Sequence, residues 1–122
     1  MKNFQGHKSL IIWQKGMEIV EDIYSITQTF PQAERFGIIS QMRRCAVSIP
    51  SNIAEGYRRK TKADFINFLH TSFGSAAELE TQLMISKKLN YLPEEKGAKI
   101  LDLLDEFCRM LRGFITLKQQ SD

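Results

Sequence analysis

Apolar residues recur every three or four positions in four long windows of this chain, and this periodicity constrains the fold more than any other feature. The spacing is typical of one face of an α-helix, on which residues three and four apart are neighbours. Only short segments separate the windows, and short connections leave consecutive helices antiparallel. The pattern predicts an all-α fold, an antiparallel up-down-up-down four-helix bundle, formed by residues 1–122 as a single domain.

The first two windows cover residues 10–29 and 34–55. The first carries two adjacent apolar rows, Trp13, Met17, Val20 and Tyr24 beside Ile12, Ile19, Ile23 and Ile26. Ser9 is the expected N-cap of the first, and Phe30-Pro31 ends it because a residue before proline avoids the helical region. Pro50 lies inside the second window, where it removes a backbone hydrogen bond, so we expect a kink. The apolar register continues across Pro50, which favours one bent helix over two, with Gly56 marking its end or a second bend.

The last two windows have clear start signals. Thr61-Lys62-Ala63-Asp64 fits a capping box, in which the Thr61 hydroxyl and the Asp64 carboxylate each accept a free N–H. Pro93 is suited to the first position of the fourth helix, and two glutamates follow it at the positive end of the helix dipole. Residues 119–122 are expected to fray at the far end of this helix.

Apolar side chains exceed what a monomeric bundle of this size should bury. Phe68 and Ile85 lie off the two core rows of the third window, and Tyr57 follows the second window. Exposed apolar surface of this kind marks interaction sites. We therefore expect self-association. The alternative is that these side chains cover the long side chains of their own bundle.

The composition indicates where in the cell the protein is expected and which state its two cysteines are expected to have. The longest apolar run has four residues, whereas a membrane span needs about 20, and the N-terminus lacks the pattern of a signal peptide. A cytoplasmic protein with no membrane association is therefore expected. Cys45 and Cys108 form no metal-binding spacing, and both fall on apolar faces, where they are expected to be reduced core thiols.

Positive charge is concentrated in one segment of the chain. Residues 35–62 contain seven basic residues and the single acid Glu55, a net charge of +6, whereas the whole chain has +3. Such a basic stripe can contact phosphates along a nucleic-acid backbone. The predicted nucleic-acid-binding residues are Arg44, Arg58, Arg59, Lys60 and Lys62. The alternative is a solvated helix face whose cations pair with Glu55 and with acids of neighbouring helices.

Three further charged residues lie next to apolar faces and are interpreted structurally. Arg43 adjoins the core row of the second window, and Glu78 and Glu80 lie in a segment of the third that otherwise reads as core. We expect them to form arginine–carboxylate pairs between helices or between subunits, pairs that are costly to break when buried. Ser48 and Asn52 are expected to bond backbone groups that the proline kink frees.

No catalytic constellation is found in the sequence. Neither His7 nor His70 has a glutamate three residues earlier, as a di-iron bundle requires, and no glycine-rich phosphate loop is present. The acids at positions 18, 21 and 22 lack a matching second acidic pair and are expected on an exposed helix face. A protein without enzymatic activity, metal or cofactor is therefore predicted.

Two stretches closely resemble a known family. Residues 41–56, QMRRCAVSIPSNIAEG, and residues 74–83, GSAAELETQL, are similar to the signature of four-helix-bundle proteins encoded in bacterial 23S ribosomal RNA intervening sequences. Residues 10–14, 29–31 and 89–92 extend the resemblance over nearly the full length. The resemblance implies a bundle that assembles into ring-like homopentamers. The accessory variability determinant of diversity-generating retroelements is similar, which implies nucleic acid and a reverse transcriptase as partners.

Two functional hypotheses from different classes follow. The first is a non-enzymatic, homo-oligomeric accessory protein that binds RNA or DNA through the surface from Arg44 to Lys62. The second is a protein–protein interaction scaffold, in which the basic residues are internal salt-bridge partners. Salt dependence separates them, because phosphate contacts weaken steeply with added salt and apolar contacts do not.

Overall fold

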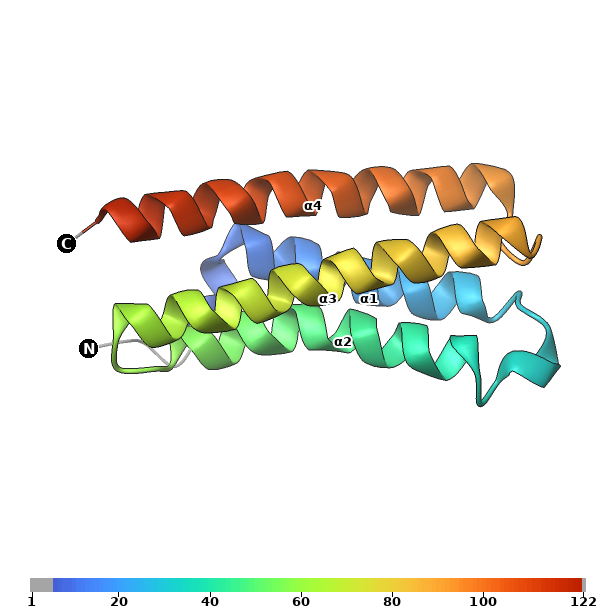
Figure 1. The fold of residues 1–122 in the computed structure, drawn as a ribbon, viewed down its shortest axis with the longest axis horizontal. Helices are drawn as coiled ribbons and strands as arrows, with labels where there is room; N and C mark the ends of the chain where they lie inside the picture. The colour runs from blue at the N-terminus through green and yellow to red at the C-terminus, as the bar shows by residue number, and fades with distance from the viewer. Residues whose placement is uncertain (1–5, 122) are drawn as a thin grey trace.

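The computed structural model describes residues 6–121, which form four long helices arranged as a bundle (Figure 1). In chain order the elements are η1 (Gly6–Ser9), α1 (Ile11–Thr27), η2 (Gln32–Glu34), α2 (Ile38–Tyr57), α3 (Lys62–Lys88) and α4 (Glu94–Gln120), where η denotes a short 3-10 helix. Each long helix packs against the next along the chain, and α1 also packs against α4. The predicted all-α antiparallel four-helix bundle is confirmed.

The core consists of one buried row from each helix, as the apolar periodicity predicts. The α3 row is buried along its whole length: Phe65, Leu69, Ser72, Ala76, Leu79 and Leu83. The α2 and α4 rows are buried over most of theirs. Of the two rows expected for α1, the isoleucine row is the buried one. Met17 and Tyr24, from the other row, are exposed at the margin of the bundle.

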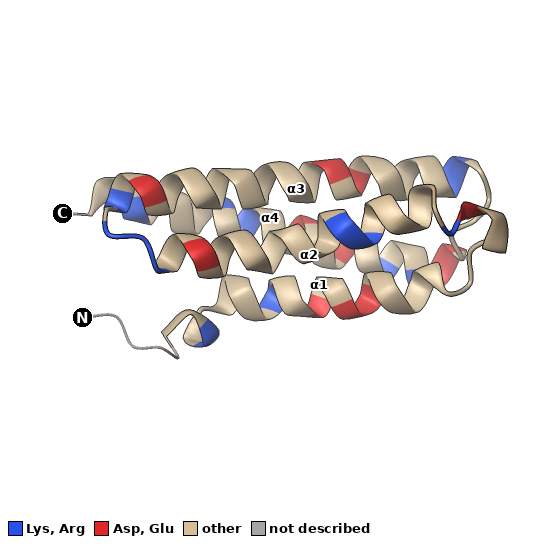
Figure 2. Ribbon diagram, turned by 90° about the horizontal axis from the view of Figure 1, so that it is seen from below, with Lys and Arg blue, Asp and Glu red and all other residues tan. Residues whose placement is uncertain are grey.

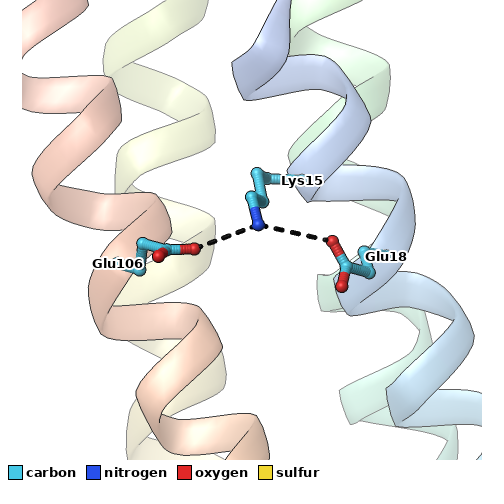
Figure 3. Close-up of polar contacts among 3 residues, drawn as sticks. All are labelled: Lys15, Glu18 and Glu106. Carbon is cyan, nitrogen blue, oxygen red and sulfur yellow. Dashed lines mark ion pairs between the residues drawn. The ribbon is translucent and has the colours of Figure 1, made fainter.

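A charged contact joins α1 to α4 (Figure 3). Lys15 Nζ lies 3.1 Å from Glu106 Oε1 of α4 and 3.8 Å from Glu18 Oε2 on its own helix. The hydrogen bond to Glu106 is the main reason why the pKa of Lys15 is raised, and the charges of both glutamates add to it. Because these side chains are accessible to water, the contact orients the two helices more than it stabilises them.

The starts of the first two helices differ from the sequence prediction. Ser9 is not the N-cap of α1: its hydroxyl donates to the Gly6 carbonyl within η1, and Leu10 takes the cap position without a side-chain bond. The second helix begins at Ile38 rather than at position 34, because Gly37 has a non-helical conformation. Glu34 belongs instead to η2, and its carboxylate accepts a hydrogen bond from the Tyr91 hydroxyl at 2.9 Å.

The other helix ends agree with the prediction more closely. The Asp64 N–H donates to Thr61 Oγ1 at 3.1 Å, which is the first half of the predicted capping box. The α4 helix begins at Glu94, one residue later than expected, and Pro93 is its N-cap. The predicted fraying of the end of α4 is wrong for residues 119 and 120, because the helix continues to Gln120. Ser121 follows the helix as its C-cap, and its carbonyl accepts a hydrogen bond from Lys62 Nζ. Residue 122 lies outside the described residues.

The α2 helix passes through Pro50 as a single helix, as its continuous apolar register predicts. Side chains bond the two carbonyls that directly precede the proline. Asn52 Nδ2 donates to the Ser48 carbonyl at 2.8 Å, and the buried Ser72 hydroxyl of α3 donates to the Ile49 carbonyl at 2.9 Å. The first bond lies within α2, and the second joins the proline-containing turn to α3.

Both cysteines are free thiols, and Cys45 lies in the core. Burial raises the pKa of the Cys45 thiol to about 11, with a smaller effect from the negative charge of Glu78. A thiol with so high a pKa is a poor nucleophile, so Cys45 contributes to core packing rather than to chemistry. Along residues 6–121, no helix has the length and apolarity that crossing a membrane requires.

Candidate nucleic-acid interface

Four of the five predicted binding residues lie together in the turn between α2 and α3, and we call Arg58, Arg59, Lys60 and Lys62 the turn cluster. All four are exposed. The turn forms because α2 ends at Tyr57 and the Thr61 cap starts α3 at once. Figure 2 shows this turn in blue at the end of the bundle where the C-terminus also lies. The sequence prediction placed these four residues together correctly.

Arg59 and Lys62 of this cluster have polar partners within the protomer. Arg59 Nη2 lies 2.6 Å from Glu55 Oε2, and the Arg59 guanidinium carbon lies 4.7 Å from the ring centre of Phe68. Lys62 is bonded to the Ser121 carbonyl. Pairing with Glu55 was the alternative interpretation of the basic segment, and it holds for Arg59. Because Glu55 and Asp64 are the acids next to four cations in this turn, the cluster keeps a net positive charge.

Two lysines outside the basic segment lie near the turn cluster. Lys118 Nζ of α4 lies 5.9 Å from the ring centre of Phe65, which is in the first turn of α3. Lys8 follows His7 in η1. The pKa of His7 is lowered mainly by burial and further by the positive charges of Arg58 and Lys8, so both cations lie near this histidine. Lys8 and Lys118 therefore extend the positive surface. The antiparallel order contained a signal for Lys118, since it brings the α2–α3 turn to the same end as the last turn of α4.

Arg44, the fifth predicted residue, is exposed but lies apart from the turn cluster. Fourteen residues separate it from Arg58, which corresponds to roughly 21 Å along a helix. The hydroxyl of Ser48, between the two, is not free to meet a phosphate, because its Oγ lies 2.8 Å from Ser75 Oγ of α3. The predicted single stripe is therefore two separate basic clusters.

The second cluster surrounds a hollow of about 480 Å³ between α1, the segment after η2 and α2, which we call the arginine pocket. Its main lining residues are Tyr24, Arg35, Phe36, Ser40, Arg43 and Arg44. Sequence reasoning missed Tyr24 and Phe36, because their spacing assigned Tyr24 to a core row and placed Phe36 inside the second helix. The available signal was the glycine that follows Phe36. Gly37 is the non-helical N-cap of α2, so Phe36 lies before the helix.

Arg43 is not brought together with Glu78 and Glu80 within the protomer. Its Nε donates to Thr27 Oγ1 at 2.9 Å and its Nη2 to the Tyr24 carbonyl at 3.3 Å, so the side chain faces α1. Glu78 and Glu80 are exposed on α3. Among the described residues no ion pair joins them to Arg43, because the side chain is held on the other side of α2. Pairing between subunits stays a prediction.

The acidic face of α1 shows no metal-binding geometry. Glu18 and Glu21 are exposed, and Asp22 is half-buried. The pKa of Asp22 is raised mainly by burial and further by the charges of these two neighbours. Within residues 6–121, no group of three or more His, Cys, Asp and Glu side chains is placed to hold a metal ion.

The surplus apolar surface lies elsewhere than predicted. Tyr57 and Phe68 are half-buried against Phe65 and Arg59 respectively, and of the three predicted residues only Ile85 is exposed. An open apolar groove of about 860 Å³ runs instead between the start of α1 and the end of α4. Ile11 and Leu117, which are 59% and 68% exposed, line this groove.

Comparisons with known proteins agree with this fold. The family model described as 23S rRNA-intervening sequence protein matches residues 8–113. A crystal structure of a protein of unknown function from the S23 ribosomal protein family of Bacteroides thetaiotaomicron superposes with a TM-score of 0.80. The two chains are 25% identical, and the match covers 87% of this chain and 96% of the other. No curated protein matches the chain.

Proposed function

The chain belongs to the family of 23S rRNA-intervening sequence proteins, and from this premise we propose that it is a non-enzymatic, homo-oligomeric accessory protein that binds nucleic acid. The turn cluster supplies the main contacts. The observation that supports this proposal most directly is the exposure of all four of its cations at one end of the bundle, where they outnumber Glu55 and Asp64, the acids within the same stretch of chain. The family name refers to 23S rRNA, which makes structured RNA the first ligand to test.

The chemistry of the cluster suits contact with a phosphate backbone. Arginine and lysine side chains bind phosphate oxygens without reading sequence, and each such contact releases condensed counterions. The pairing of Arg59 with Glu55 holds its guanidinium near the ring of Phe68, which limits its freedom before any ligand binds. Lys62, bonded to Ser121, fixes the end of α4 beside the cluster. Binding by backbone and shape is therefore favoured over base readout.

A salt titration tests this proposal. Affinity for structured RNA should fall with added salt, and the log–log slope should decrease in magnitude by about 2 when three phosphate contacts are lost. The test variant is Arg58→Gln/Arg59→Gln/Lys60→Gln, which spares Lys62. The matched control is Lys87→Gln/Lys88→Gln/Lys96→Gln, which removes the same charge from exposed positions at the opposite end of the bundle.

The two variants distinguish a located interface from general attraction. Weaker binding and a smaller slope in the turn variant alone would support the proposal. Equal loss in both variants would mean that only net charge matters, and no binding by the native protein would contradict the proposal outright. In that last case the protein–protein scaffold becomes the better interpretation, and a reverse transcriptase, the protein partner that the resemblance implies, would be the first candidate to test.

A further inference from the structure

The arginine pocket combines three guanidinium groups with two aromatic rings, and no carboxylate lines it. Glu34, the acid next to Arg35 in the sequence, is engaged elsewhere by the Tyr91 hydroxyl. Within the described residues no ion pair involves Arg35, Arg43 or Arg44. Three positive charges around one hollow without a compensating acid favour an anionic ligand.

The aromatic rings of the pocket are arranged beside its guanidinium groups. The guanidinium carbon of Arg35 lies 4.9 Å from the ring centre of Phe36, and that of Arg43 lies 4.6 Å from the ring centre of Tyr24. Phe36 is nevertheless 85% exposed. Packing within the protomer does not account for this aromatic ring, because most of it is exposed to water. A flat apolar ring beside cations is the arrangement on which nucleic-acid bases stack.

The cations of the pocket differ in their freedom. Arg43 is held by its bonds to Thr27 and Tyr24, so it is already positioned before a ligand arrives. Arg44 is exposed, and no hydrogen bond or ion pair is present for it among the described residues. Arg35 and Arg44 are therefore the groups that can turn toward a phosphate, while Arg43 orders the Tyr24 side of the pocket.

We propose that the arginine pocket binds one unpaired nucleotide of a nucleic-acid strand, with its base stacked on Phe36 and its phosphate bound by Arg35 and Arg44. This inference rests on the proposed function and adds a ligand class, since bases inside a duplex cannot stack on a side chain. The separation of about 21 Å between Arg44 and the turn cluster corresponds to about six phosphates at the roughly 3.4 Å spacing of a stacked strand, and to fewer along an extended one. A single strand of about twelve nucleotides is therefore long enough to contact both clusters.

The test compares three probes: a twelve-nucleotide oligo(U), the same strand with abasic positions throughout, and a twelve-base-pair RNA duplex. Phe36→Ala should weaken oligo(U) binding by about tenfold, because one stacking contact is lost, and should leave the abasic strand and the duplex unchanged. Arg44→Gln should weaken both single strands. The matched control is Leu89→Ala, which removes an exposed apolar side chain outside the pocket and should change nothing.

A second measurement does not depend on any variant. Oligo(U) containing 5-iodouridine should form a photo-crosslink to the peptide that contains Phe36, or to the one that contains Tyr24, when bound to the native protein. Crosslinks confined to other peptides would overturn the proposal. So would unchanged oligo(U) affinity in Phe36→Ala.

The outcomes separate this inference from the proposed function. If Phe36→Ala binds every probe as the native protein does, while the turn variant has lost binding, the pocket assignment fails and the proposed function stands. If the native protein binds none of the probes, both fail. A change of oligomer mass in Phe36→Ala would show that another copy covers the pocket. Tighter binding of a phosphotyrosine peptide than of oligo(U) would assign it to a protein partner. Either result would overturn the proposal.

Discussion

Asn90 and Tyr91 link the end of α3 to the turn before α2. Asn90 has a positive φ of 62°, and the N–H groups of Asn90 and Tyr91 donate to the carbonyls of Lys87 and Ser86, respectively. This is the Schellman arrangement, in which a left-handed residue closes the helix; asparagine adopts that conformation more readily than most residues. It directs the Tyr91 hydroxyl to Glu34 Oε2, 2.9 Å away.

The Tyr91–Glu34 hydrogen bond makes stability depend on alkaline pH. The bond is the main reason why the pKa of Tyr91 is raised above its usual value of 10.0. Because the folded pKa exceeds the unfolded one, this contribution is fully present below about pH 10 and is lost as the pH rises through the folded pKa. Tyr91→Phe should therefore show a smaller fall in melting temperature between pH 9 and 11 than the native protein. Parallel curves would contradict this assignment.

At the scale of elements, the close contact between α2 and α3 depends on Gly56. A Cβ atom at this position would lie 2.6 Å from Phe68 Cβ and 3.1 Å from Phe65 Cδ1. Gly56 lies within the last turn of α2, so its role is close packing rather than the helix end or bend that the sequence suggested. Gly74, in the middle of α3, has no neighbouring atom within 4 Å of such a Cβ.

The two glycines predict opposite effects of the same substitution. Gly56→Ala should lower the free energy of unfolding by about 1–3 kcal/mol, because the methyl group forces the two helices apart. Gly74→Ala should raise it by about 0.5–1 kcal/mol, since alanine favours a helix and meets no obstacle. Urea unfolding measures both changes in the free energy of unfolding, provided that the m-value is the same in the variants and the native protein. Similar free energies for the two variants would show that α2 and α3 adjust without cost.

Apolar periodicity predicted the four long helices well. It failed at helix starts, where a short turn uses residues that would also fit a helix. The rows through Leu69 and Met42 are buried because a repeating face needs only the helical period to be recognised. Ser9 was misassigned because a short 3-10 turn also uses a hydroxyl, and that turn leaves no periodic signal. The start of α2 was placed too early because Glu34 fits a helix, whereas Gly37 interrupts it in three dimensions.

At the scale of the whole molecule, the sequence predicted that positive charge is concentrated in residues 35–62 but not how the basic residues divide into clusters. Arg44 shares a helix face with the turn cluster in a periodic projection, yet the axial distance separates them. The arginine pocket depends on Tyr24 and Phe36, which come from two elements and approach only when α1 packs against α2. A tertiary arrangement of this kind has no signature in either segment alone.

The groove lined by Ile11 and Leu117 gives the self-association proposal a location. We expect the native protein to be larger than one 14.1 kDa chain in multi-angle light scattering, with about 70 kDa if the pentamer implied by the family resemblance forms. Ile11→Gln/Leu117→Gln should shift the mass toward the protomer, because polar side chains lower the gain from burying the groove. Leu89→Gln is the matched control. A native protein of protomer mass would contradict the proposal.

The contact between Lys15 and Glu106 has a consequence for how the chain reaches this structure. Neighbouring helices along the chain are also neighbours in space, so most contacts close only short loops. The seam between α1 and α4 differs from the contacts between consecutive helices, because it joins segments about 90 residues apart. Chains with mostly local contacts fold fast, and closing a long loop costs the most conformational entropy. We therefore expect the helical hairpins to form first during folding and the seam between the first and last helices to close late.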